Sequence, residues 1–183
     1  MKQALARSRG LQSIAATVVL TAAVLLWVYL EGGPHALREH YGLLAPALWI
    51  PAQVIVNLSP VSDLVPWAVL NGSMYGLWPG ALMSWLVWLC SSSLQFAIAR
   101  RTARDFSLDE RMAAMPRWLR RFPVAHPVFL IVGRWIPVSS ALVNVAAGAL
   151  GVRYARLLWC AALGAAPPAL VLAAVGAGLV RVF

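Results

Sequence analysis

The sequence has few charged residues, and acidic residues are the scarcest of them. Only 11% of the 183 residues are charged and just six are Asp or Glu, whereas 61% are hydrophobic. A soluble domain needs a much larger share of polar residues to cover its surface. The scarcity of charge therefore excludes an ordinary soluble domain and predicts an integral membrane protein.

Cysteine and histidine are also scarce. Cys90 and Cys160 lie in apolar segments without a CxxC spacing, and His35, His40 and His126 have no cluster of ligand residues around them. These patterns do not fit a disulfide, a metal site or a cofactor site. The sequence also has no Ser/His/Asp arrangement, no phosphate-binding loop and no paired carboxylates in its apolar segments. We therefore expect no enzyme activity, no catalytic residue, no metal and no cofactor.

Basic residues outnumber acidic ones, with 15 Lys and Arg and a net charge of +9. On a soluble protein this excess would indicate nucleic acid as the partner. Here the basic residues lie between apolar runs, where they orient membrane spans and contact anionic lipids. We therefore expect membrane lipids, and not nucleic acid, as partners.

Three apolar segments are long enough to cross a bilayer, since about 20 residues at a rise of 1.5 Å span its hydrocarbon core. The expected spans are 11–30, 81–99 and 157–180. The apolar run of the first is too long for a signal peptide, so we expect it to be retained. The third should be kinked at Pro167 and Pro168, because proline removes a hydrogen bond from the helix.

Two further apolar stretches, 42–79 and 124–151, are interrupted by prolines. Each has a polar group near its middle, NLSPVSD and GRWIPVSS, so that the tripeptide PVS occurs in both, at Pro60 and Pro137. Proline beside serine and a charge argues against a continuous helix. It predicts a re-entrant hairpin that enters the membrane, turns and leaves on the same side, with limbs of about 10–15 residues. Alternatively, the first stretch forms two ordinary kinked spans.

The placement of charge predicts the orientation. Loop 100–122 carries seven arginines, whereas the link 31–41 carries one arginine and two glutamates. By the positive-inside rule the N-terminus, this basic loop and the turn 151–156 are cytoplasmic. The basic loop is either solvated or forms a short interfacial helix.

With this orientation the two hairpins enter from opposite sides, which is the inverted-repeat layout of many transporters. We therefore expect an all-α fold that forms one membrane domain over 1–183, with three spans and two re-entrant hairpins.

Asp63 and Arg134 are the charges that remain within these interrupted stretches, one in each polar group. A lone charge at this depth is unfavourable by about 3 kcal/mol on insertion scales, so it normally faces a partner or water. We expect the two residues to approach each other at the bilayer centre. In one alternative they form a buried ion pair that joins the two halves of the chain.

In the other alternative they line a polar cavity. Arg134 would then bind a phosphate headgroup, because its guanidinium matches phosphate oxygens. Asp63 would carry a proton, since burial favours the neutral form of a carboxyl group, although nearby Arg134 favours the charged form.

Polar residues and glycines accompany these charges. Helix N-termini favour anions through their free N–H groups, and the side chains expected to cap or line an anion site are Ser62, Ser139, Ser140 and Asn144. Small residues at four-residue spacing let helices pack closely, and the glycines expected to do so are Gly72, Gly76, Gly148 and Gly151.

Segment 129–167, FLIVGRWIPVSSALVNVAAGALGVRYARLLWCAALGAAP, resembles the signature of the DedA/SNARE-associated (VTT-domain) membrane proteins. In that signature an arginine lies three residues before a proline and is followed by an apolar limb, a glycine and the aromatic-containing start of the next helix. Segment 60–100 is similar to the first hairpin of that family and the crossing after it, so the resemblance covers about 42–180. Arg134 matches the arginine of the motif, and Asp63 matches the acidic position of the first hairpin.

The resemblance implies a lipid transporter of the cell membrane with two re-entrant hairpins. This would be a flippase or scramblase for phospholipids or polyprenyl phosphates, with proton coupling, in a bacterial inner membrane. Ser140 stands where DedA members proper often carry a second arginine, which points to a sub-branch. Two other functions remain open: a non-transporting membrane factor for envelope homeostasis or assembly, and a small-ion transporter. The sequence is compatible with a homo-oligomer.

Overall fold

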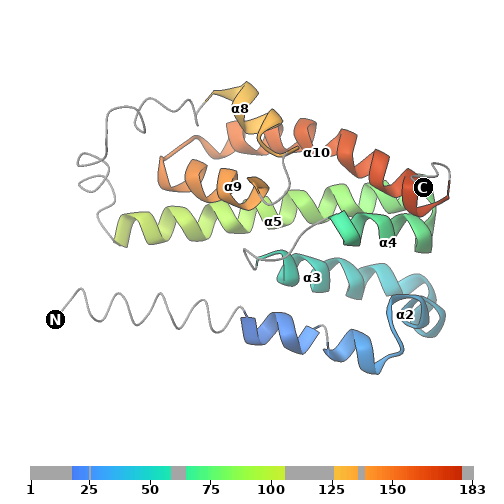
Figure 1. The fold of residues 1–183 in the computed structure, drawn as a ribbon. Coiled ribbons are helices and arrows are strands. Elements are labelled where there is room, and N and C mark those ends of the chain that lie inside the picture. Colours follow the sequence, from blue (N-terminus) through green and yellow to red (C-terminus); the bar gives the residue numbers. More distant parts are fainter. Residues whose placement is uncertain (1–17, 25, 59–64, 106–125, 136–138, 179–183) are drawn as a thin grey trace. The chain divides into compact units, whose positions relative to one another are not determined.

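The computed structural model of the chain describes residues 18–24, 26–58, 65–105, 126–135 and 139–178. All secondary structure in these residues is helical, which confirms the prediction of an all-α fold. A helix over 18–24 and 26–30 comes first. It is followed by α2 (Pro34–Tyr41), the 3-10 helix η1 (Gly42–Leu44), α3 (Ala45–Asn57), α4 (Val65–Tyr75), α5 (Leu77–Asp105), α8 (Pro127–Val132), α9 (Ser139–Ala149) and α10 (Tyr154–Gly176) (Figure 1).

Two of these helices, α5 and α10, are long and apolar enough to cross a membrane. They correspond to the expected spans 81–99 and 157–180. A third candidate is the helix Val18–Leu30 taken together with His35–Tyr41, a pair that is bent by 71°. The bend lies between Leu30 and His35, after the span predicted over 11–30, and the described part of that span is helical. Whether it crosses the membrane stays a prediction.

The boundaries of α5 differ from the predicted span. The helix begins at Leu77, where Gly76 ends α4 with a φ of 82° that glycine adopts without strain. Pro79 is tolerated there because the first turn of a helix has no intrahelical partners for its N–H groups. The helix continues to Asp105, so the start of the predicted basic loop 100–122 is helical. The rest of that loop, from residue 106, lies outside the described residues.

The chain divides into two compact units, Met1–Ser91 with Ala166–Phe183 and Ser92–Ala165. Each unit contains a part of α5 and a part of α10. We call them unit 1 and unit 2.

In unit 1, α3 and α4 form a contacting pair, which we call the first helix pair. Trp49 and Gln53 of α3 both donate hydrogen bonds to Asn71 of α4, and Trp49 meets Trp67 edge to face at 5.5 Å. The two helices have 13 and 11 residues, within the predicted length of a limb. The buried apolar core around them consists of Val28, Leu37, Trp49, Met74 and Met83.

In unit 2, α8 and α9 form the second helix pair. His126 caps α8 by accepting a hydrogen bond from the backbone of Val128, and Pro127 occupies the first turn, where proline is favoured. α8 has only six residues, so this limb is shorter than the predicted 10–15. The buried core of the unit consists of Phe96, Leu130, Val143, Ala147, Val152, Leu157 and Cys160.

Both helix pairs break where the polar groups of the sequence predicted a turn. α3 ends at Asn57 and α8 ends at Val132, each at the start of one of these polar groups, while 59–64 and 136–138 lie outside the described residues. That each pair forms a re-entrant hairpin in a bilayer stays a prediction.

Candidate functional site

Arg134 lies in the segment that connects α8 to α9. The backbone N–H groups of Arg134 and Trp135 donate to the carbonyls of Ile131 and Val132, at 3.3 and 3.0 Å, so the chain tightens at the end of α8. Gly133 permits this turn, because a Cβ there would lie 2.7 Å from the carbonyl oxygen of Phe129. The local fold therefore places the arginine directly after the last turn of α8.

The guanidinium of Arg134 is held by three neutral oxygens. Nε donates to the carbonyl of Leu130 at 2.9 Å, Nη1 to Ser92 Oγ at 3.1 Å and Nη2 to Asn144 Oδ1 at 2.6 Å. Residues from α5, α8 and α9 thus converge on one half-buried cation. Ser92 and Asn144 are themselves 4% and 2% exposed, so the two side chains that hold the terminal nitrogens are buried.

A second layer of hydrogen bonds orients Asn144. Its Nδ2 donates to Ser92 Oγ at 3.1 Å and to Gln95 Oε1 at 2.8 Å. These two bonds fix which end of the Asn144 amide faces Arg134, so its carbonyl oxygen is presented to the guanidinium. We call Arg134, Asn144, Ser92 and Gln95 the Arg134 cluster.

The charge of Arg134 is not neutralised within the described residues. None of their carboxylates lies within ion-pair distance of it, and its three acceptors there are uncharged. A guanidinium has five N–H donors. One N–H on each terminal nitrogen therefore has no partner in the described part of the chain. A half-buried cation of this kind favours an anion at its open side.

Unit 1 contains a second buried polar group, centred on Asn71. The Oδ1 of this residue accepts from Trp49 Nε1 and from Gln53 Nε2, each at 2.8 Å. Its Nδ2 donates to Gln53 Oε1 at 3.1 Å and to Ser84 Oγ at 2.9 Å. Ser84 in turn donates to the carbonyl of Gly80. We call Asn71, Trp49, Gln53 and Ser84 the Asn71 cluster.

The two clusters share a pattern but differ in charge. In each, an asparagine on the second helix of a pair contacts a serine of α5 and the amide of a glutamine. Asn71 is fully buried and all four hydrogen-bonding positions of its amide are occupied by neutral groups. The Arg134 cluster is therefore the one of the two that can attract an anion.

The family model of the VTT domain matches residues 62–178, which is more than half of the chain. The chain belongs to the VTT-domain family. This is the DedA/SNARE-associated domain, a membrane protein domain associated with transporter-like function and not an enzyme family. No curated protein and no solved structure matches the chain.

Several residues that we expected at the site or at its turns lie outside the described residues: Pro60, Ser62, Asp63 and Pro137. The predicted approach of Asp63 to Arg134 therefore remains a prediction. Of the others, Asn144 contacts Arg134 directly. Ser139 and Ser140 are the first two residues of α9, and the side chain of Ser140 is half-buried.

Ser92, Gln95 and the whole Asn71 cluster were not predicted from the sequence. The available signal was polar residues inside a predicted span, because Ser92 and Gln95 belong to the string CSSSLQ within 81–99. Such residues in a membrane helix almost always face the protein interior and a polar partner. Gln53 and Asn71 gave the same signal within the first interrupted stretch.

The expected packing glycines divide into two kinds. A Cβ on Gly72 would collide with the backbone of Ala173 in α10, and one on Gly148 would lie 2.6 Å from the carbonyl oxygen of Phe96 in α5. Gly76 and Gly151 have positive φ values of 82° and 67°, and a Cβ on either would meet no atom within 4 Å. The packing interpretation is therefore wrong for Gly76 and Gly151, which serve as turn residues at helix ends.

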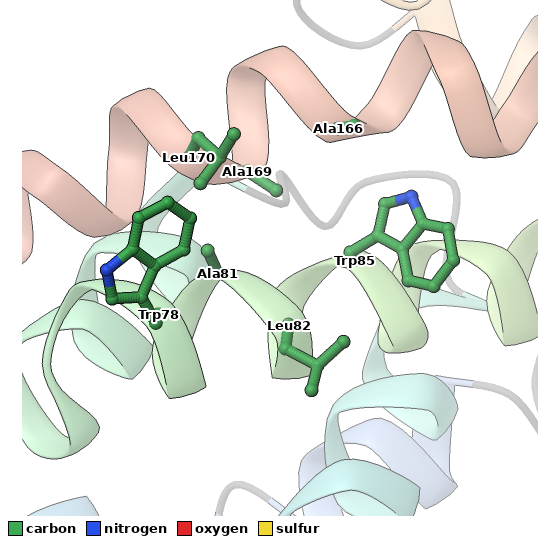
Figure 2. Close-up of a pocket in the computed structure, with 7 residues that line it drawn as sticks. All are labelled: Trp78, Ala81, Leu82, Trp85, Ala166, Ala169 and Leu170. Atoms are coloured by element: carbon green, nitrogen blue, oxygen red, sulfur yellow. The ribbon is translucent and has the colours of Figure 1, made fainter.

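A shallow apolar groove of about 260 Å³ lies between α5 and α10 within unit 1 (Figure 2). Figure 2 shows the indole rings of Trp78 and Trp85 on either side of a floor that includes Ala81. The residues that line it are Trp78, Ala81, Leu82, Trp85, Ala166, Ala169 and Leu170. It offers no titratable side chain, so we do not assign it a role in the chemistry of the site.

Proposed function

We propose that the chain is a lipid flippase or scramblase that moves phosphate-bearing headgroups, of phospholipids or of polyprenyl phosphates, across a membrane. One observation carries the proposal. The guanidinium of Arg134 is half-buried and held by neutral oxygens, with one N–H on each terminal nitrogen unpartnered in the described residues. Two such N–H groups suit two oxygens of one phosphate, which arginine binds in a bidentate manner.

The surrounding residues support an anion site. Asn144 and Ser92 fix the guanidinium, so little side-chain freedom is lost when a headgroup binds. The N-terminus of α9 begins five positions after Arg134 in the chain, at Ser139, and carries the positive end of the helix dipole. Ser140 and Ser62 complete the set of polar residues that we propose for headgroup binding.

The proposal also includes a residue for coupling transport to protons and an orientation of the chain in the membrane. Asp63 carries a proton or pairs with Arg134 when no headgroup is bound. The chain is placed in a bacterial inner membrane with its N-terminus in the cytoplasm, because the arginine-rich segment 100–122 favours that side.

The test is reconstitution of the purified protein into lipid vesicles. Translocation of a labelled phospholipid and of a labelled polyprenyl phosphate would be measured by quenching the label from outside. We expect at least one of these lipids to cross faster than in protein-free vesicles. Folded protein that moves neither lipid above the protein-free rate would contradict the proposal.

The same vesicles separate the rival functions. A small-ion transporter would change internal pH or membrane potential without moving lipid, so a pH dye and a potential dye are read in parallel. A non-transporting membrane factor would change none of the three signals.

A further inference from the structure

Trp135, the residue after Arg134, makes an unusual contact with α10. Its indole Nε1 donates a hydrogen bond of 3.0 Å to the backbone carbonyl oxygen of Gly164. The indole is 54% exposed, so burial of the ring does not explain its position. The contact therefore depends on that carbonyl being available in the middle of a helix.

Pro168 makes the carbonyl available. In an α-helix the carbonyl of residue 164 accepts a hydrogen bond from the N–H of residue 168. Proline has no N–H, so this bond cannot form in α10. α10 nevertheless continues as one helix from Tyr154 to Gly176. The indole of Trp135 thus satisfies a backbone acceptor that Pro168 leaves open.

Gly164 also lies beside the side chain of Arg134. A Cβ at Gly164 would lie 3.2 Å from Cδ of Arg134 and 3.1 Å from the carbonyl oxygen of Ile131. Glycine at this position lets the end of α8 approach the backbone of α10. Two successive residues, Arg134 and Trp135, therefore rest on Gly164, one by close packing and the other by a hydrogen bond.

We propose that the bond from Trp135 to Gly164 is a latch that positions Arg134 for headgroup binding, and that Pro168 is required because it keeps the acceptor free. The part of this inference that concerns transport rests on the proposed function. The part that concerns the hydrogen bond of Trp135 and the position of Arg134 does not depend on transport. Trp135 is a positioning residue and does not itself bind the headgroup.

The experiment compares Trp135→Phe, Pro168→Ala and the double variant. Trp135→Phe keeps an aromatic ring but removes the donor. Pro168→Ala supplies a backbone N–H that can occupy the Gly164 carbonyl. Trp159→Phe, an exposed tryptophan of the same helix, and Pro167→Ala, which acts on the carbonyl of Leu163, are the matched controls.

Two readouts test the latch, and thermal unfolding is added for the double variant. Hydrogen–deuterium exchange of the amides in 127–135 reports the latch directly, and translocation of a labelled phosphate-bearing lipid reports its effect on transport. In Trp135→Phe we expect exchange at Arg134 and Trp135 to rise about fivefold, the factor for the loss of one hydrogen bond, and translocation to fall by a similar factor. The two controls should stay within twofold of the wild type in both readouts.

The double variant distinguishes two roles of Trp135: positioning Arg134, and satisfying the free carbonyl of Gly164 in α10. The alanine N–H satisfies the Gly164 carbonyl, so thermal stability should return toward that of the wild type, while exchange at Arg134 stays high and translocation stays low. Recovery of translocation in the double variant would overturn the proposal, because the indole would then only repair the helix. Unchanged exchange in Trp135→Phe would also overturn it.

Failure of the proposed function gives a different result. If the wild type moves no lipid, the transport readout is silent for every variant, while the exchange readout still supports or overturns the latch.

Discussion

Asn71 and Asn144 make comparable hydrogen bonds, but Asn71 stabilises the packing of helices and Asn144 stabilises the position of Arg134. The amide of Asn71 joins α3, α4 and α5 within unit 1 through neutral hydrogen bonds alone. The amide of Asn144 links Arg134 to Ser92 and Gln95 within unit 2. We therefore expect substitutions at Asn71 to change mainly the stability of the fold. Substitutions at Asn144 should change mainly the position and hydrogen bonding of the Arg134 guanidinium.

Replacing Asn71 with alanine should lower the free energy of unfolding by about 1–3 kcal/mol, because the Trp49 indole and the Gln53 amide would stay buried without partners. The measurement is unfolding of the purified protein in detergent. Ser73→Ala, an exposed position on the same helix, is the control and should change stability by less than about 0.5 kcal/mol. An Asn71→Ala variant as stable as this control would show that the cluster contributes little to the fold.

At the scale of helices, α4 and α10 pack through glycines that face each other's backbone. A Cβ on Gly72 would collide with Ala173, and a Cβ on Gly176 would collide with Val69. The contact is reciprocal, since each helix contributes one glycine and receives the backbone of the other. Close backbone approach of this kind is a common basis for helix association in membranes.

Gly72→Ala tests this contact by the sign of the change in stability. Alanine in an unhindered helix position stabilises by up to about 1 kcal/mol relative to glycine. Here we expect destabilisation instead, because the new methyl group would meet the backbone of Ala173, which cannot move as a flexible side chain can. Thermal unfolding in detergent measures it, with Val171→Ala as an exposed control on α10. A stabilised Gly72→Ala protein would refute the close contact.

The sequence predicted the breaks between helices better than their lengths. Prolines with serine and a charge predicted breaks inside 57–63 and 133–140, and α3 and α8 end at Asn57 and Val132, at the start of these two groups. The short length of α8 was not predictable from the sequence. His126 and Pro127 are the only local signs of where this helix starts, and the rest of its sequence is uniformly apolar. Spacing alone also could not separate Gly72, which packs, from Gly76, which turns, because only the facing backbone distinguishes them.

The predicted kink at Pro167 and Pro168 stays a prediction. The prolines correctly identify lost helical hydrogen bonds, yet α10 continues as one helix through both of them. A donor from elsewhere in the chain, Trp135, satisfies one of the freed carbonyls. Such a long-range partner cannot be read from the local pattern around the prolines.

At the scale of the whole molecule, the sequence predicted the membrane class and the family. Low charge and long apolar runs predicted membrane spans, and the resemblance of segment 129–167 to the VTT signature indicated the domain that the family model matches. The partners of Arg134 were only partly predictable. Ser92 and Gln95 come from a distant helix, and their convergence on Arg134 depends on the tertiary fold.

The central claim is that Arg134 recognises the negative charge of a lipid headgroup. Its most direct test is the translocation rate of an anionic phosphate lipid relative to a lipid with an uncharged headgroup, in vesicles containing wild type, Arg134→Gln or Arg153→Gln. Arg153 is an exposed arginine, so its variant carries the same change in net charge.

We predict that Arg134→Gln slows the anionic lipid at least about tenfold, the factor for a lost charge-assisted hydrogen bond. Its rate for the uncharged lipid, and both rates of Arg153→Gln, should stay within twofold of the wild type. An Arg134→Gln protein that moves the anionic lipid as fast as the wild type, or that slows both lipids equally, would contradict the account.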